Sequence, residues 1–399
     1  MDLGPRNFIW PPVDDEIEQA VVAQLRESVS IFDGGGIFAD FEARFAEMHG
    51  RSYACLFSSG TSALHAAYVA LELQPGDEVV CPAYTFWSTV TPLLWTGAVP
   101  VLCDCDEEGN LDVDSVAALV TERTKAVVVT HLWGVPAQVE RLHALCAGAG
   151  IRLLEDCSHA HGARSGDRLV GTFGDIAVWS LQGHKTVNGG EGGILLCDEP
   201  AFFHWSLLFG HGSQRCLSQM PADHPLHEYG VTGMGLKQRA HPLAIAIAAN
   251  LLQRLPAILA GRQRVADLWT AAIGECPSAT VARPGDRTFS WYALPLVLSD
   301  RRQRDEVLER LHTLGVPEAS APGTTCPLNL LPLFQAPGRL FRGRPLTQDF
   351  AFEPGMFPVA EDLYRRTIVI PVFAGLTERE DQLALLYRDR IGRALSASD

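Results

Sequence analysis

One lysine of the chain, Lys185, lies in a stretch of small residues, SLQGHKTVNGGEGG at residues 180–193. Apolar runs at residues 175–179 and 194–197 flank this stretch and are typical of buried strands. Four glycines among residues 189–193 would let the backbone pass close to a ligand or a second chain. Removal from water favours the neutral form of an amine, and a neutral lysine attacks carbonyl groups to form a Schiff base. The competing interpretation is a solvated surface charge.

An acidic pair, Glu155-Asp156, follows a second apolar run at residues 151–154. A carboxylate at the carboxyl end of a strand points into the crevice where open α/β sheets bind ligands. A carboxylate that faces a pyridine nitrogen keeps it protonated and makes the ring an electron sink. Asp156 together with Lys185 would therefore suit pyridoxal phosphate. Taken alone, Asp156 is more commonly a helix N-cap or a turn residue.

A third segment has the composition of an anion site. The apolar run at residues 53–57 ends in Ser-Ser-Gly-Thr-Ser at residues 58–62, and a helix is predicted over residues 63–73. Small residues at the start of a helix leave backbone N–H groups free at the positive end of its dipole, where anions bind. A plain capped helix would explain the same residues.

Four motifs, in order and spacing, resemble those of the DegT/DnrJ/EryC1/StrS sugar aminotransferases, which are fold type I pyridoxal phosphate enzymes. The resemblance covers nearly the whole chain. It rests on SGTSAL at 59–64, PAYTF at 82–86, Glu155-Asp156 with HGA at 161–163, and the stretch at 180–193.

The resemblance implies a role for each matching residue. Lys185 would hold the cofactor as a Schiff base and then act as general base, while Asp156 faces the ring nitrogen. Many family members have glutamine where this chain has His159, and histidine can donate the same hydrogen bond to the ring hydroxyl. The residue that stacks on the ring is predicted to be Phe86, with Trp87 as the competing neighbour and an aromatic core as the simpler interpretation. The phosphate contacts are predicted to be Gly60, Thr61 and Ser180.

The chain departs from the family pattern at residues 235–239, Gly-Leu-Lys-Gln-Arg. Most relatives have Gly-x-Asn-x-Arg, and the asparagine reaches the phosphate in the partner subunit. This chain has Lys237 in its place, and lysine also binds phosphate, as a point charge. We therefore predict a homodimer with shared active sites, in which Lys237 contacts the cofactor of the partner subunit.

The predicted activity is transamination. An amino acid, glutamate or glutamine by resemblance, would donate its amino group to a nucleotide-linked keto sugar or a keto cyclitol, in amino sugar, aminocyclitol or antibiotic biosynthesis. A competing hypothesis is a sugar dehydratase of the same fold, in which histidine replaces the lysine. Here His184 is adjacent, but the register puts Lys185 at the key position. Two further hypotheses are a regulator that binds the cofactor without turnover and a phosphate-binding protein without pyridoxal.

Composition restricts the classes of partner. The net charge of −15 argues against nucleic acid, whose binding requires clustered lysine and arginine. The N-terminus lacks the pattern of a signal peptide, and the longest apolar helix candidate, residues 243–252, is too short to span a bilayer. No cysteine pair has zinc spacing, so we predict no metal site and reduced core thiols in a cytoplasmic protein.

Strands and helices alternate through the first part of the chain, which predicts a mostly parallel sheet between helices. We expect a large cofactor-binding domain at residues 1–255 and a smaller C-terminal α+β domain at 256–399. Residues 200–232 lack periodicity and are predicted to form a long active-site loop. Further expectations are helices at 243–255 and 257–273, a strand at 287–298, and an excursion at 316–358 that covers the substrate.

Overall fold

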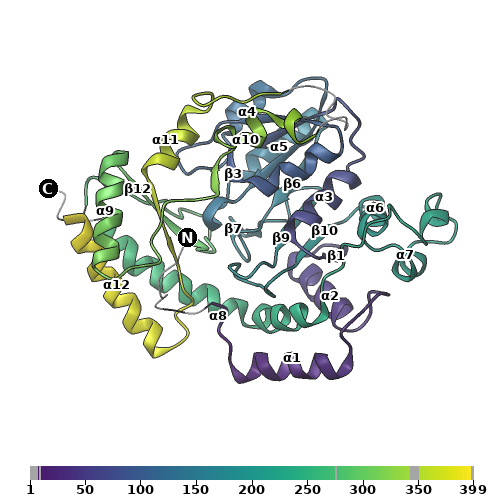
Figure 1. The fold of residues 1–399 in the computed structure, drawn as a ribbon, viewed down its shortest axis with the longest axis horizontal. Helices are drawn as coiled ribbons and strands as arrows, with labels where there is room; N and C mark the ends of the chain where they lie inside the picture. Colours follow the sequence, from purple (N-terminus) through teal and green to yellow (C-terminus); the bar gives the residue numbers. More distant parts are fainter. Residues whose placement is uncertain (1–7, 9, 275, 342–349, 397–399) are drawn as a thin grey trace.

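The computed structural model describes residues 8, 10–274, 276–341 and 350–396. Its centre is a seven-stranded sheet with the order β1-β10-β9-β6-β5-β2-β4 (Figure 1). The strands are β1 (Tyr53–Phe57), β2 (Glu78–Pro82), β4 (Val99–Cys103), β5 (Thr124–Thr130), β6 (Arg152–Asp156), β9 (Ile176–Ser180) and β10 (Gly193–Cys197). Within this sheet only β10 runs antiparallel to its neighbours, so the expected mostly parallel sheet is confirmed.

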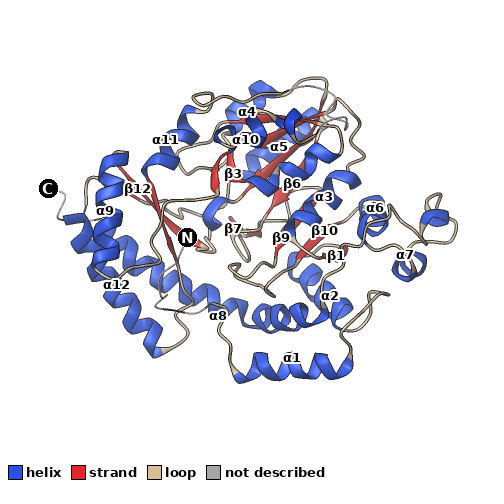
Figure 2. Ribbon diagram, in the orientation of Figure 1, coloured by secondary structure: helices blue, strands red, loops and turns tan. Residues whose placement is uncertain are grey.

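Helices cover both faces of this sheet (Figure 2). The helices of this part are α1 (Asp15–Glu27), α2 (Ile37–His49), α3 (Gly60–Ala70), α4 (Val113–Leu119), α5 (Val139–Ala149), α6 (Pro200–Gly210), α7 (Gln214–Gln219) and α8 (Pro242–Ile273). Successive strand residues point to opposite faces. Thus Leu195 packs in the core with α3 and α6, whereas Ile194 and Leu196 pack with α2 and α8.

A second, three-stranded sheet lies in the C-terminal part, with the order β11-β12-β14. It has its own core with the end of α8. The elements are β11 (Ala279–Thr280), β12 (Ala293–Leu298), α9 (Arg301–Thr313), α10 (Pro332–Gln335), α11 (Pro358–Arg366), β14 (Thr367–Pro371) and α12 (Glu378–Ser396). The predicted domain division near residue 255 falls within α8 and stays a prediction.

Short elements connect these parts. The small strands are β3 (Tyr84–Phe86), β7 (Arg164–Ser165), β8 (Arg168–Leu169) and β13 (Thr325–Pro327). The 3₁₀-helices are η1 (Trp87–Thr89), η2 (Thr91–Trp95), η3 (Leu132–Gly134), η4 (His227–Tyr229), η5 (Leu328–Leu330) and η6 (Pro337–Arg339). Strand β13 pairs with β3 in a separate two-stranded sheet, so the excursion at 316–358 reaches the segment that follows β2; its residues 342–349 lie outside the described residues. All ten cysteines are free and nine are buried, as expected for core thiols.

The prediction of a long loop over residues 200–232 was wrong at its start. Residues 200–210 form α6, which buries Phe202, Leu207 and Phe209 in the core beside α3. A helix that is apolar on all sides shows no amphipathic period, because every face is buried. The rest of the segment holds α7, η4 and irregular turns.

The two helices predicted on either side of Pro256 are one helix, α8. Pro256 lies on the exposed side, while the flanking Leu255 and Ile258 are buried and hold the helix together. The expectation that no apolar helix is long enough for a bilayer was therefore also wrong: by length and composition alone, α8 would suit a membrane span. Thirteen of its residues are nevertheless buried against the rest of the protein.

The strand predicted at residues 287–298 begins later, at Ala293. The residues before it form an irregular turn in which Trp291 has a φ of +49°. This left-handed backbone conformation interrupts the extended chain and, as shown below, places Tyr292 in the candidate site.

Candidate active site

Three chain segments meet at the start of α3. The Ser59 hydroxyl accepts the N–H of Ser62 at 3.0 Å, and its carbonyl accepts the N–H of Ala63 at 3.1 Å. The first bond caps one unpaired donor of the first turn and the second is the first i→i−4 bond of the helix, which leaves the N–H groups of Gly60 and Thr61 for a ligand. A Cβ on Gly60 would lie only 2.7 Å from the Cβ of Ser180. The structure thus brings together the three residues predicted to bind phosphate.

Gly193 allows this close approach. It pairs with Phe57 and with Ser180 in the sheet, and a Cβ at this position would lie 2.4 Å from the carbonyl oxygen of Ser59 and 2.6 Å from the nitrogen of Gly60. The start of α3 can therefore rest on the ends of β9 and β10 only where the side chain is absent.

We expect Gly193→Ala to destabilise the protein by about 1–3 kcal/mol through overpacking and to weaken cofactor binding at least about tenfold. The matched control is Gly148→Ala, in the exposed last turn of α5, where an added Cβ meets nothing within 4 Å. Thermal unfolding and a spectroscopic titration with pyridoxal phosphate measure the two effects. Equal cofactor affinity in both variants would contradict a phosphate cradle at this position.

Asp156 is the last residue of β6 and is 6% exposed. Its Oδ2 accepts a hydrogen bond from the Thr89 hydroxyl at 2.8 Å, and its Oδ1 accepts the N–H of Ser158 at 3.1 Å. Because the Thr89 proton is used on Asp156, the hydroxyl of Thr85, 2.9 Å away, must donate to Thr89. This chain of bonds holds the carboxylate in one orientation beside the strand that carries Phe86.

The other acid of the pair, Glu155, points to the opposite face of the strand and is fully buried. It accepts hydrogen bonds from the N–H groups of Gly171, Phe173 and Gly174 and from His131. Although burial opposes it, the His131 hydrogen bond keeps the pKa of Glu155 below its ordinary value. The ligand atoms of His131, Glu155 and Cys157 lie within 4.8 Å of one another, but the first two are used within the fold, so we assign the group a structural role.

Lys185 lies at the tip of a hairpin that extends β9 and β10. Backbone bonds of 2.8 Å join Leu181 to Gly192 and Gly183 to Gly190. The Lys185 carbonyl accepts the indole N–H of Trp10 at 2.8 Å, and its Nζ lies 4.7 Å from the centre of the Tyr292 ring. The neighbouring His184 side chain is exposed to solvent. The chain therefore presents the lysine, and not the histidine, to the interior.

The rings of His159, Trp133 and Tyr292 are nearly parallel and form a cluster, in which the Trp133 and Tyr292 centroids are 6.5 Å apart. The Tyr292 ring is stacked on the His159 ring at 4.2 Å and 9°, and the Trp133 ring at 5.7 Å and 19°. The N–H of Trp133, which has a φ of +58°, donates to Nδ1 at 3.3 Å. Nδ1 is thus the acceptor, and Nε2 carries the proton of the neutral ring. Removal from water and the charge of Lys185 hold the pKa of His159 well below its ordinary value, which keeps the ring neutral.

Phe86 follows Thr85 in β3, where it pairs with Thr325 of β13. Its ring lies 4.8 Å from that of Trp87, which is 38% exposed. The structure places the two rings side by side, so the choice of Phe86 as the stacking residue stays a prediction.

Lys237 is exposed, and among the described residues no side-chain contact joins it to Lys185 or to the start of α3 of its own chain. Its neighbour Gln238 accepts hydrogen bonds from the hydroxyls of Ser58 and Ser62, at 3.0 and 2.9 Å. The segment is thus fixed at the start of α3 while Lys237 itself points outward. A role for Lys237 in the partner subunit stays a prediction.

Four further residues of this region were not predicted from the sequence: Thr89, Trp133, Gln238 and Tyr292. Thr89 follows the aromatic cluster and Gln238 follows Lys237, so their position beside predicted residues was a weak signal. Tyr292 lies 107 residues beyond Lys185 in a run that looked like an ordinary strand, and no local pattern indicates its place.

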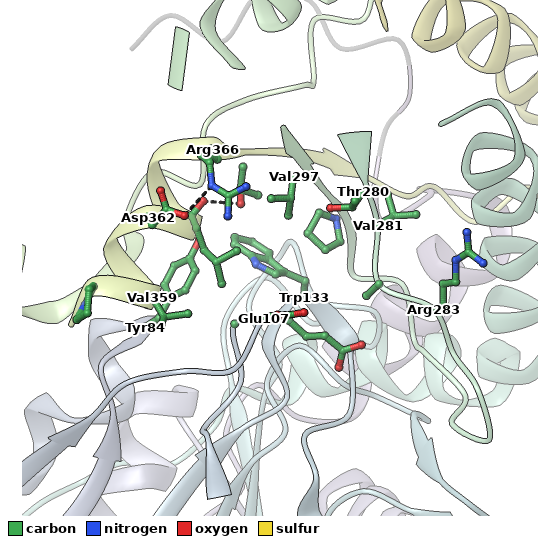
Figure 3. Close-up of a pocket in the computed structure, with 17 residues that line it drawn as sticks. Tyr84, Glu107, Trp133, Thr280, Val281, Arg283, Val297, Val359, Asp362 and Arg366 are labelled. Carbon is green, nitrogen blue, oxygen red and sulfur yellow. Dashed lines mark hydrogen bonds and ion pairs between the residues drawn. The ribbon is translucent and has the colours of Figure 1, made fainter. Parts of the chain in front are cut away.

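A cleft of about 660 Å³ opens beside this region, between the strands β11 and β12, helix α11 and the chain that follows β4 (Figure 3). Trp133 points into it, as does Tyr84, whose buried hydroxyl has no partner among the described residues. At its upper edge Arg366 and Asp362 form an ion pair at 2.8 Å. Trp133 therefore separates the cleft from His159.

The chemistry of this donor set fits pyridoxal phosphate. Free backbone N–H groups at a helix start suit a phosphate, a buried carboxylate suits a protonated pyridine nitrogen, and a primary amine suits an aldehyde. The carboxylate and the amine follow the carboxyl ends of the adjacent parallel strands β6 and β9, where α/β sheets bind ligands, and the helix start follows β1 of the same sheet.

Comparison with known proteins gives a family, named relatives and a solved structure of similar fold. The model of the DegT/DnrJ/EryC1/StrS aminotransferase family matches residues 12–384. GDP-perosamine synthase of Caulobacter vibrioides is 30% identical over 78% of this chain and 83% of that protein. 3-Amino-5-hydroxybenzoate synthase of Amycolatopsis mediterranei is 30% identical over 80% and 82%. The crystal structure of an aminotransferase from Psychrobacter cryohalolentis superimposes with a TM-score of 0.83, at 26% identity and 98% coverage of both chains.

Proposed function

The chain belongs to the DegT/DnrJ/EryC1/StrS aminotransferase family, and on this basis we propose the substrates and the residues with which it works. It is a pyridoxal phosphate-dependent aminotransferase. We propose that it moves an amino group from glutamate or glutamine to a nucleotide-linked keto sugar or a keto cyclitol. GDP-perosamine synthase and 3-amino-5-hydroxybenzoate synthase, whose names indicate sugar and ring-acid products, support this substrate class.

One observation carries the assignment of the site: Lys185 and His159 contact the same Tyr292 ring, and His159 follows Asp156 by three residues. An amine, a neutral imidazole N–H donor and a fixed carboxylate therefore lie in one region. The bound cofactor supplies an electron sink for the charge left when the donor Cα loses its proton.

The chain's own groups have separable roles in this proposal. Gly60, Thr61 and Ser180 bind the phosphate, and Nε2–H of His159 donates to the ring hydroxyl. The Asp156 carboxylate holds the proton on the ring nitrogen, and Thr89 orients that carboxylate. The Nζ of Lys185, once free, is the general base that takes the proton from the donor Cα and then, as an ammonium group, gives it up again. The covering aromatic rings limit the access of water.

The visible absorbance spectrum tests this assignment, combined with borohydride reduction and peptide mapping. The chain has three lysines, Lys125, Lys185 and Lys237, so the site of a reduced adduct is easily distinguished. We expect a yellow band that disappears on reduction and an adduct on Lys185. An adduct on another lysine, or no band with added pyridoxal phosphate, would refute it. Product analysis with a panel of keto sugars and keto cyclitols then separates the aminotransferase from a non-catalytic regulator.

Exposed apolar side chains support a homodimer. Val22, Leu25 and Phe32 lie on α1 and the turn after it. A second group lies on α7 and in the chain between α7 and α8, comprising Leu217, Tyr229, Val231, Met234 and Leu236. The turn after α1 contacts α7, because a Cβ on Gly34 of that turn would lie 2.9 Å from the Arg215 side chain of α7. Large apolar side chains that a single chain leaves exposed often lie in an interface. We propose that the dimer buries these side chains and places Lys237 at the site of the partner subunit.

Lys237→Ala should weaken cofactor binding about 10–100-fold, because a charge-assisted hydrogen bond to phosphate is lost. Lys125→Ala, which removes another exposed lysine, is the control and should bind normally. The predicted exchange between subunits is tested by mixing Lys185→Ala chains with Lys237→Ala chains at limiting cofactor. If Lys237 acts across the dimer, mixed dimers contain one intact site and regain activity. If it acts within its own chain, no intact site forms and activity stays low.

A further inference from the structure

Tyr292 holds a position that its local sequence does not explain. It comes from the turn before β12, in the C-terminal part of the chain, yet its ring covers His159 and faces the Nζ of Lys185. Neither the family match nor the motif residues assign it a role.

The backbone that carries Tyr292 is held by hydrogen bonds from Ser290 to the backbone of His159 and of Gly134. The Ser290 hydroxyl donates to the His159 carbonyl at 2.8 Å, and the Ser290 N–H donates to the Gly134 carbonyl at 3.0 Å. A Cβ on Gly134 would lie 2.4 Å from the Ser290 hydroxyl and 3.0 Å from the Tyr292 nitrogen. The turn therefore fits tightly against the chain that orients His159.

Two non-glycine residues with positive φ flank this contact, Trp133 at +58° and Trp291 at +49°. Each such conformation costs about 1–3 kcal/mol and persists only where the surroundings enforce it. The strain at Trp133 aims its N–H at His159, and the strain at Trp291 turns the next residue, Tyr292, onto the same ring. Two strained residues that converge on one side chain indicate a functional arrangement.

The charges around Lys185 explain what the ring contributes. His159 and His161 face it from the loop after β6, and burial together with the Lys185 charge keeps the pKa of both well below the ordinary value. From α8, the buried Arg262 donates to the Thr186 hydroxyl beside it at 2.8 Å. Among the described residues, no carboxylate forms an ion pair with Lys185. The face of the Tyr292 ring is therefore the contact that favours the protonated amine.

We propose that Tyr292 is a positioning residue for the transfer reaction, which receives the ammonium of Lys185 on its ring whenever that lysine is free and keeps the His159 ring in its plane. The proposal rests on the proposed function, in which Lys185 alternates between a covalent bond and a proton-carrying amine. When Lys185 accepts a proton as general base, the π face stabilises the resulting charge 4.7 Å away. The C-terminal part of the chain thereby contributes directly to the stability of the protonated Lys185 amine.

The test measures the titration of Lys185 in the cofactor-free full-length protein. Competitive acetylation across a pH series, read by mass spectrometry, follows each of the three lysines separately, with exposed Lys125 as internal reference. The variants are Tyr292→Leu and Tyr292→Met without the ring, and Tyr292→Phe with it. Tyr364→Leu is the matched control, because it removes a partly buried ring elsewhere, beside Tyr84.

We expect the Lys185 midpoint to fall by roughly 0.4–1.5 pH units in the ring-free variants and to change little in Tyr292→Phe and Tyr364→Leu. If the ring only shields Lys185 from the reagent, its removal would raise the acetylation rate of Lys185 at high pH without moving the midpoint of its titration. That result would overturn the proposal. Thermal unfolding identifies any ring-free variant that does not fold. If Tyr292→Leu or Tyr292→Met fails to fold, the midpoint measured in the other variant tests the proposal. Since no cofactor is present, the outcome is independent of the borohydride test of the proposed function.

Discussion

Lys185→Ala should abolish amino-group transfer, with a fall in kcat of at least about 10⁴-fold, because the chain loses both its nucleophile and its general base. The adjacent side chain, His184, cannot take over the role of the Lys185 amine. His184 is exposed, and the hairpin bonds of residues 181–192 fix the register that points Lys185 inward. Steady-state kinetics, and separate measurement of each half-reaction, would show the loss.

Lys185→Arg is the matched control for charge, because a guanidinium keeps the positive charge but is not a nucleophile at neutral pH. It should be as inactive as the alanine variant. A small primary amine such as methylamine should restore part of the proton transfer in Lys185→Ala, since it supplies a base in the space left by the side chain. Substantial turnover by Lys185→Arg would show that the lysine serves only as a charge.

Asp156→Asn should lower kcat by about 10²–10³-fold while the protein still folds and binds the cofactor phosphate. The carboxylate is the one negative charge fixed at the end of β6 toward the site, since Glu155 faces the opposite side of the sheet. A neutral amide cannot hold a proton on a pyridine nitrogen by charge, so the electron sink is weakened where charge develops.

The matched variant is Thr89→Val, which keeps the Asp156 charge and the side-chain shape but removes the hydroxyl that donates to Oδ2. It also leaves the Thr85 hydroxyl without its acceptor. We expect a loss of roughly 3–10-fold, the size of one hydrogen bond. If Asp156→Asn lost no more activity than Thr89→Val, the carboxylate would have a structural role and not an electrostatic one.

The secondary structure near the motifs was largely predictable, because it follows from short-range pattern. The strands at β1, β6, β9 and β10 were each indicated by an apolar run that ends in small or acidic residues. The failures came where burial removes the pattern. Helix α6 is buried on nearly every side, so its sequence has no amphipathic period. Helix α8 continues through Pro256, and Leu255 and Ile258 on either side of this proline are buried against the rest of the protein.

The acidic pair shows how far local reasoning reaches. The alternation of strand side chains implies that Glu155 and Asp156 face opposite sides, but it does not say what each side contains. The structure places three backbone N–H groups and His131 around Glu155. Beside Asp156 it places the hydrogen-bonded hydroxyls of Thr85 and Thr89. Those partners come from other loops, so only the folded chain distinguishes the structural acid from the one available to a ligand.

The sequence by itself determined the family and the cofactor, and it predicted Lys185, Asp156 and the phosphate contacts, because these depend on motifs whose residues are close together in the chain. Only the tertiary structure decided that Nδ1 of His159 accepts the Trp133 N–H, that Thr89 orients Asp156, and that Tyr292 faces Lys185. These contacts join residues 26 to 107 positions apart, whose proximity depends on sheet order and on two strained turns. No local pattern carries that information, since the same residues in another packing would be ordinary core side chains.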